Sequence, residues 1–368
     1  MTQRLFVLSP CGTSILTNGR NQEERGLINK LSNIDKREHI PEEHLPFFDN
    51  LFSERASFLA NASNEAAAKI SAEINTLIKI YEGKKPANGD FHYLIATDTW
   101  LGRETAKLVE RWLLAKNPAI ITQIYTPSGL QTEKIDLFQQ ALSDLVRNLT
   151  KLLDENKERG YKILFNLTGG FKSVQGFLQS IANFYADETV YIFERSPNLL
   201  RIPRLPIKLS STEIIEENLE VFRRLAIGLS EQQVEDIPET FLFNMGEQTT
   251  LSPWGELLWK ESKPAIYNKR LLPSPTAKIQ FTKRFEKTVN SLSPKKIIEV
   301  NSRIDQFYRH LNDPKYNPSS LDFKPLKGNP KPPSTHEIDA WGDKDARRIF
   351  GHFENEVFVL DDLDKGLH

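Results

Sequence analysis

The feature that most constrains this chain is the stretch 162–172, Lys-Ile-Leu-Phe-Asn-Leu-Thr-Gly-Gly-Phe-Lys. Its apolar run, Ile163–Phe165, suits a short buried parallel strand. Gly169 and Gly170 then permit backbone angles and close approaches that side chains forbid. A helix is expected to begin near Lys172, so free backbone N–H groups and an ammonium group would face one spot, which suits a phosphate or another anion. An ordinary strand-to-helix turn can carry the same pattern.

Two further segments read as strands that end in small polar residues. Arg4–Leu8 is followed by Ser9–Asn18, which is rich in hydroxyl groups, and Tyr93–Ala96 is followed by Thr97 and Asp98. In open α/β sheets, ligands bind beyond the carboxyl ends of the strands. Neither the dinucleotide fingerprint nor a P-loop is complete. The expected ligand is therefore not NAD, and the site is not a standard nucleoside triphosphatase.

The composition predicts a soluble globular protein. Of 368 residues, 39% are hydrophobic and 26% charged, and the length allows two or three domains. Cys11 is the single cysteine, so the chain has no disulfide framework or Cys-based zinc site, and we expect Cys11 to be a packed residue and the protein to need no metal. A run of about 18 apolar residues is absent, and the chain begins directly with a strand. We therefore expect a cytoplasmic protein without a membrane partner.

The order of elements predicts three parts. Strands and helices alternate over 1–207, as in an α/β fold with a parallel sheet. Part 208–270 reads as helices followed by a hairpin, a winged-helix-like connector whose acidic first helix favours a structural relay over DNA binding. Part 271–368 reads as α+β, with one strand, two helices and three antiparallel strands. The helices predicted for all three parts are Asn64–Tyr81, Gly102–Ala115, Thr132–Lys157, Lys172–Tyr185, Thr212–Leu229, a short one after Ser230 that contains Gln233 and Val234, one or two turns over Pro253–Lys260, Thr282–Leu292 and Pro294–Leu311.

The near-zero net charge hides an asymmetry. Lys269–Pro333 holds 14 Lys and Arg against 5 Asp and Glu, whereas Ser334–His368 holds 4 against 9. A basic block of this size in a neutral chain indicates a polyanion partner, with RNA favoured. The alternative is a solvated basic helix face.

The turn Gly12-Thr13-Ser14 together with Asn166–Lys172 resembles the CARF sensor domain of CRISPR-associated proteins, over about residues 1–205. The resemblance implies a Rossmann-like fold, a homodimer, and a cyclic oligoadenylate bound at the dimer axis, for which cyclic tetra-adenylate is our choice. By the same resemblance, the residues that line the ligand pocket are Thr13, Ser14, Thr97, Asp98, Thr168, Gly169, Gly170 and Lys172.

The C-terminal part carries a second resemblance. Pro325-Leu326-Lys327-Gly328, then Arg347–Phe350, then Val357–Leu360 with Lys365, resemble in their order the RelE/HigB/YoeB toxins, over about residues 277–368. Toxins of this family cleave mRNA, usually in the ribosomal A site. The whole chain is similar to a class of CRISPR-associated mRNA interferases, so the implied partners are mRNA and the ribosome.

Metal-independent RNA cleavage needs a base for the 2′-OH, an acid for the leaving oxygen, and cations for the phosphorane. Arg347 and Arg348 are adjacent in a strand and face opposite sides, and Arg348 matches the family's arginine better. Glu337 and Asp339 stand where some relatives carry lysines. Either carboxylate could serve as the base, and the alternative is that they stabilise the sheet or face solvent. The remaining candidates are Lys324, Lys327, Lys365, His336, His352 and His368, although each histidine also fits an ordinary surface position.

Two other functions remain open on the sequence. One is a nucleotide-regulated RNA- or DNA-binding regulator without nuclease activity. The other is a sensor that also degrades its cyclic nucleotide, with Lys172 and Thr13 aiding hydrolysis.

Overall fold

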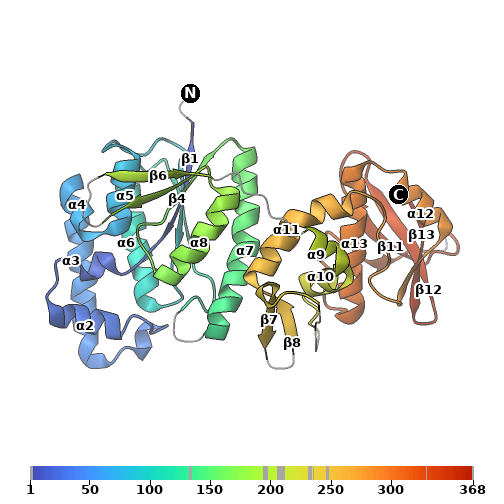
Figure 1. The fold of residues 1–368 in the computed structure, drawn as a ribbon, viewed down its shortest axis with the longest axis horizontal. Helices are drawn as coiled ribbons and strands as arrows, with labels where there is room; N and C mark the ends of the chain where they lie inside the picture. Colours follow the sequence, from blue (N-terminus) through green and yellow to red (C-terminus); the bar gives the residue numbers. More distant parts are fainter. Residues whose placement is uncertain are drawn as a thin grey trace. The chain divides into compact units, whose positions relative to one another are not determined.

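A computed structural model describes the chain as two compact units, Met1–Lys208 and Leu209–His368, which are treated separately below (Figure 1). The predicted boundary after residue 207 lies one residue from this division, whereas the one after residue 270 falls inside the second unit. The residues described are 3–131, 135–193, 198–204, 212–230, 234, 236–245, 248–328 and 330–366.

The first unit is built on a six-stranded sheet in the order β3-β2-β1-β4-β5-β6 (Figure 1). All neighbouring pairs are parallel except β5 and β6, which are antiparallel. The predicted α/β class with a largely parallel sheet is therefore confirmed. The strands are β1 (Leu5–Pro10), β2 (Phe91–Ile95), β3 (Ile121–Tyr125), β4 (Lys162–Asn166), β5 (Glu188–Ile192) and β6 (Leu199–Pro203).

Helices cover this sheet, and one difference from the prediction bears on the site. The expected helix Asn64–Tyr81 is broken at Ser71, whose extended backbone ends one helix and whose hydroxyl caps the next. The predicted helix Thr132–Lys157 is described from Ile135 onward. The helices are α1 (Ser14–Thr17), α2 (Gln22–Lys30), η1 (Arg37–His39), η2 (Glu42–His44), α3 (Leu45–Asn61), α4 (Asn64–Ile70), α5 (Ala72–Ile80), α6 (Trp100–Lys116), α7 (Ile135–Glu158) and α8 (Lys172–Tyr185).

The second unit begins with helices and a hairpin, in the predicted order. Of the short helix expected after Ser230, Gln233 lies outside the described residues and Val234 has no regular structure. The elements are α9 (Thr212–Glu217), α10 (Leu219–Ala226), η3 (Glu239–Phe241), β7 (Leu242–Met245), β8 (Gln248–Leu251) and α11 (Pro253–Tyr267).

A five-stranded sheet in the order β10-β11-β12-β13-β9 completes the second unit. Strand β9 is parallel to β13, and the other neighbours are antiparallel. Strand β10 was not predicted. The last strand, expected over Glu356–Leu360 with Lys365 just past it, extends to Lys365 itself. The elements are β9 (Ile279–Phe281), α12 (Lys283–Asn290), α13 (Pro294–Asn312), β10 (Lys324–Pro325), β11 (His336–Trp341), β12 (Arg347–Glu354) and β13 (Val357–Lys365).

A buried ion pair joins the predicted connector to α13. Arg223 Nη2 lies 2.7 Å from Asp305 Oδ1, and both side chains are 3% exposed. The Tyr267 hydroxyl donates to the other carboxylate oxygen of Asp305. Asn301 of α13 also donates to the Tyr267 carbonyl and accepts from the Leu272 backbone N–H. The connector and the C-terminal part each have a hydrophobic cluster, and these buried polar contacts join them within one compact unit.

Candidate functional site

The candidate ligand site lies where the order of the first sheet reverses. Strand β1 has β2 on one side and β4 on the other, and the chain runs from β1 toward β2 but from β4 toward β5. The connections after β1 and β4 therefore leave in opposite directions, which opens a crevice at their carboxyl ends. Figure 1 shows these two strands in the middle of the sheet. Both predicted glycine turns follow them.

The two turns touch through glycine backbones. A Cβ atom added at Gly12 would lie 2.9 Å from the backbone N of Gly170, closer than real Cβ contacts. Gly170 has φ +93°, and a Cβ there would lie 2.8 Å from Cβ of Pro10. Side chains are therefore excluded at both positions, and the first and fourth strand ends form one continuous surface.

A buried carboxylate that the sequence analysis missed lies between these turns. The Glu73 side chain, at the start of α5, accepts the Gly12 N–H at 2.8 Å with one oxygen. Its other oxygen accepts the Ser14 hydroxyl at 3.1 Å and the Ser71 hydroxyl at 2.8 Å. A Cβ at Gly169 would lie 2.0 Å from Glu73 Oε1. The sequence signal that could have identified Glu73 is a charged residue on the apolar face of the predicted helix Asn64–Tyr81.

Two of the predicted ligand-binding hydroxyls make contacts within the protein. The Ser14 hydroxyl donates to Glu73 and accepts the Ala72 N–H at 3.1 Å. The Thr168 hydroxyl lies 2.7 Å from the Thr76 hydroxyl and accepts the Ile192 N–H at 3.0 Å. These side chains hold the turns in place.

Thr97 and Asp98 are likewise used structurally at the end of β2. Thr97 is buried against the first turn of α6, where a Cβ at Gly102 would lie 2.0 Å from its hydroxyl oxygen. Asp98 accepts from Arg103 Nη1 at 2.9 Å and from the Gly129 N–H at 2.9 Å. The structure thus gives both residues a role in fastening α6 and the following turn.

The groups left available for a ligand are Thr13 and Lys172. Lys172 is the exposed first residue of α8, and the helix has no side-chain cap at Phe171. Within the described residues, Lys172 makes no ion pair and the Thr13 hydroxyl has no hydrogen-bond partner. An ammonium group beside uncapped N–H groups suits a phosphate.

Cys11 lies in the first turn and is buried, as expected. Burial, with a smaller contribution from the Glu73 carboxylate, raises the pKa of its thiol well above the usual range. A protonated, buried thiol is a poor nucleophile, so Cys11 is a packing residue here.

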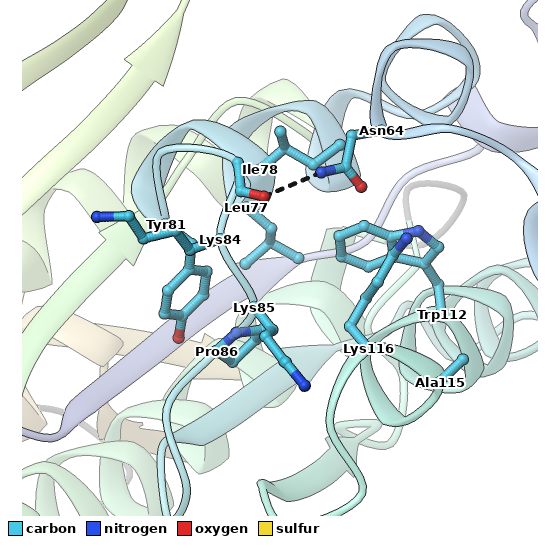
Figure 2. A pocket seen from close by; sticks show the side chains of 11 residues that line it. Asn64, Leu77, Ile78, Tyr81, Lys84, Lys85, Pro86, Trp112, Ala115 and Lys116 are labelled. Atoms are coloured by element: carbon cyan, nitrogen blue, oxygen red, sulfur yellow. Dashed lines mark hydrogen bonds between the residues drawn. The ribbon is translucent and has the colours of Figure 1, made fainter.

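A pocket of about 310 Å³ lies at the other end of the strands of the same sheet, near the amino ends of β2 and β3. Figure 2 shows Leu77 and Trp112 facing each other across it, and Asn64 donates to the Gly83 carbonyl at 3.2 Å along its rim. Because the glycine turns follow the carboxyl ends of β1 and β4, this pocket is separate from the candidate site.

In the second unit, Arg348 lies among carboxylates on one face of the sheet. Its guanidinium nitrogens lie 2.9 Å from Glu337, 3.0 Å from Asp339 and 3.4 Å from Asp322. Lys324 joins the group, 2.5 Å from Asp322 and 3.7 Å from Glu337. We call these five residues the Arg348 cluster. It holds two cations and three carboxylates.

The environments of two carboxylates in the cluster differ. Hydrogen bonding to Lys324, helped by the charges of Lys324 and Arg348, lowers the pKa of Asp322. Burial raises the pKa of Asp339 despite the nearby Arg348. A carboxylate whose pKa moves toward neutrality is the stronger base, so Asp339 is the better proton acceptor of the two.

The other predicted catalytic residues lie apart from Arg348. His336 is adjacent to Glu337 in β11 and therefore faces the opposite side, where its ring stacks on Phe323 at 5.0 Å. Burial lowers the pKa of His336. Lys327 and Lys365 are exposed, and His368 lies outside the described residues. Of the described candidates, Lys324 alone contacts the carboxylates that hold Arg348.

His352 belongs to a separate group on β12. Its Nδ1 lies 2.8 Å from Asp361, which also accepts the Ser334 hydroxyl at 2.7 Å. Burial by itself lowers the pKa of His352, but the bonds and charges of Asp361 and Glu354 outweigh burial and raise it. His352 lies four positions after Arg348 along the strand, a spacing of about 13 Å, which is too far for both to act on one phosphodiester.

Four of the 14 Lys and Arg of the basic block pair with carboxylates of the acidic end of the chain. Arg284 pairs with Asp362 at 2.7 Å, and Lys331 pairs with both Asp362 and Asp364. Lys315, Lys327, Lys344 and Lys365 are exposed and form no ion pair with described residues. Four more lysines of this kind lie within 278–295, around β9, α12 and the start of α13. We call this set the α12 lysines: Lys278, Lys283, Lys287 and Lys295.

No helix in the described residues is long and apolar enough to span a membrane. Within the same residues, His, Cys, Asp and Glu form no group of three or more that could hold a metal ion.

Comparison with known proteins connects part of the first unit to CRISPR systems. Residues 68–205 match a family described as CRISPR-associated protein (Cas_APE2256). Among solved structures, the chain is similar to Enterococcus italicus Csm6 bound to cyclic hexa-2′-fluoro-hexa-dAMP, with 11% identity and a TM-score of 0.31. That match covers 60% of this chain and 46% of the Csm6 chain, so it spans less than half of Csm6. No curated protein matches this chain. The segment that contains β2 to β6 and α5 is therefore similar to a CRISPR-associated family.

Proposed function

We propose that this protein is a CRISPR-associated sensor that binds a cyclic oligoadenylate with its first unit and cleaves mRNA with its second. The observation that carries the proposal is the meeting of two glycine turns, through Gly12 and Gly170, at the reversal point of a sheet whose later strands match a CRISPR-associated family. Such a crevice is where open α/β sheets bind ligands.

Ligand phosphates would bind at the start of α8. Lys172 supplies the charge and the uncapped N–H groups supply donors, while the Thr13 hydroxyl approaches from the β1 turn. An even-sized ring can lie on the two-fold axis of a homodimer and contact the same turns twice. We favour cyclic tetra-adenylate and a dimer formed through the first unit.

RNA cleavage would take place at the Arg348 cluster without a metal. In this proposal, the 2′ oxygen attacks phosphorus as Asp339 accepts its proton, and Arg348, held by Glu337, stabilises the phosphorane charge. The bond to the 5′ oxygen then breaks, and Lys324 of the same cluster donates a proton to that leaving oxygen. The site offers few matched acid–base groups, so substrate placement must supply much of the rate. Positioning is worth up to about 7–11 kcal/mol in favourable cases, and a ribosome holding the mRNA would provide it.

One observation favours the regulator without nuclease activity. The Arg348 cluster holds more carboxylates than cations, which opposes the approach of a phosphodiester, whereas the α12 lysines are free to bind RNA. A cleavage assay separates the two functions, because a regulator binds RNA and leaves it intact.

The test combines binding and cleavage. Calorimetry with cyclic tetra- and hexa-adenylate measures activator affinity, and labelled mRNA is then incubated with activator, with and without ribosomes. We expect binding, weak cleavage of naked mRNA, faster cleavage on ribosomes, and no cleavage by Arg348→Ala. Full activity of Arg348→Ala would refute the site, and equal rates on free and ribosome-bound mRNA would refute the ribosome requirement. An absence of binding would refute the sensor assignment.

A further inference from the structure

We infer that Glu73 is the positioning residue of the sensor site: its buried carboxylate fixes the relative placement of the two glycine turns and so sets the affinity for the activator. The inference rests on the proposed binding of a cyclic oligoadenylate at those turns. Glu73 is 1% exposed and accepts three hydrogen bonds, from the Gly12 N–H and from the hydroxyls of Ser14 and Ser71.

The start of α5 is fastened to the β4 turn as well as to the β1 turn. The Asn166 side chain donates to the Glu73 carbonyl at 3.4 Å, and the hydroxyls of Thr76 and Thr168 lie 2.7 Å apart. Glu73 Oε1 also fills the space beside Gly169 that a Cβ would need. One helical turn therefore braces both strand ends at once, and a change at Glu73 reaches both turns.

The same contacts decide from which side a ligand can bind. The Gly12 N–H is taken by Glu73, and the carboxylate occupies the space between the turns. A phosphate placed there would meet a buried negative charge. The ligand must therefore bind on the outward side, where Lys172 and the first turn of α8 are exposed. In this arrangement Glu73 acts on the ligand through the turns and does not touch it.

Geometry and charge predict different results for a conservative substitution. In Glu73→Gln, the amide oxygen can still accept the Gly12 N–H, and the amide nitrogen can donate to Ser14 and Ser71, because hydroxyl groups also accept. A positioning role predicts that Glu73→Gln binds the activator within about threefold of the wild type and that Glu73→Ala binds about tenfold more weakly or worse.

A matched control exists at the amino-terminal end of β2, away from the glycine turns. Asp90 is also 1% exposed and also accepts three bonds, from the N–H groups of Leu5 and Ala87 and from the Tyr81 hydroxyl. Asp90→Ala should lower the melting temperature about as much as Glu73→Ala, because both leave buried donors unpaired, while leaving activator affinity unchanged.

The experiment measures the melting temperature, the calorimetric affinity for cyclic tetra-adenylate, and hydrogen exchange in peptides covering 9–18 and 166–173, for the wild type and these variants. We expect faster exchange in both peptides for Glu73→Ala, near wild-type exchange for Glu73→Gln, and no local effect for Asp90→Ala. If Glu73→Ala does not fold, Ser71→Ala takes its place in the experiment. This variant removes one of the three donors to Glu73 and should show a smaller loss of affinity and a smaller increase in exchange.

Equal loss of affinity in Glu73→Ala and Asp90→Ala would overturn the inference, as would tighter binding by Glu73→Gln, which would indicate an effect of charge alone. If the wild type bound no cyclic oligoadenylate, the proposed function would fail. The exchange data would still decide whether Glu73 holds the turns, because unchanged exchange in Glu73→Ala would refute the positioning role without any ligand.

Discussion

Replacing Asp305 with alanine should reveal whether the connector and the C-terminal sheet unfold together. Asp305 accepts hydrogen bonds from Arg223 Nε at 2.8 Å and from the Tyr267 hydroxyl, and its Oδ1 lies 2.7 Å from Arg223 Nη2. Both charged side chains are 3% exposed. Asp305→Ala leaves the Arg223 guanidinium buried without a counter-charge. Removing one partner of a buried pair costs about 3–5 kcal/mol.

The matched control is Asp364→Ala. Asp364 pairs with Lys331 at 2.7 Å but is 54% exposed, so its loss should cost at most about 1 kcal/mol. Asp305→Leu combined with Arg223→Met should recover most of the stability lost in Asp305→Ala, because apolar residues of similar size remove the unpaired charge.

Pulse proteolysis of the full-length protein in urea measures the differences in unfolding free energy between these variants, with surviving fragments identified by mass. We expect residues 212–366 to become cleavable in a single transition that Asp305→Ala shifts to lower urea. A shift no larger than that of Asp364→Ala would refute the reasoning. Separate transitions for the fragments before and after residue 270 would support the predicted division of this region into two domains.

Three further predictions follow from individual contacts. Lys172→Ala should weaken activator binding at an unchanged melting temperature, whereas Thr168→Val should also lower the melting temperature, because its hydroxyl bonds to Thr76 and Ile192; calorimetry and thermal melts check this. Because the pKa of His352 is raised in the folded protein, its contribution to stability is present at a pH below the unfolded pKa and is lost as pH rises through the folded one. His352→Gln should therefore flatten the melting temperature–pH curve above about pH 6.5. Lys283→Gln with Lys287→Gln should reduce the slope of log affinity for RNA against log salt by about 1–2, and an unchanged slope would place RNA binding elsewhere.

The parts of the site that were predictable depend on local chemistry. A short apolar run followed by two glycines indicates a strand and a tight turn wherever it occurs, and the rule for open sheets places such turns at one edge. The placement of Gly12 against Gly170 agrees with that expectation. Glu73 could not be found in this way, because its partners Gly12 and Ser14 lie about 60 residues earlier in the chain and only the folded structure brings α5 between the turns.

The Arg348 cluster shows why counting charges along a sequence misjudges a surface. Lys324 belongs to the basic block and Glu337 to the acidic end, yet the pairing of β10 with β11 sets them opposite each other. The pairing of β11 with β12 likewise sets Asp339 opposite Arg348. Strand register, which the counts do not contain, therefore places cations of the basic block in a cluster where carboxylates outnumber them. A phosphodiester that binds there has to replace a carboxylate as the partner of Arg348. Asp322 is the one most easily displaced, because it makes the longest contact with Arg348 and is the most exposed of the three.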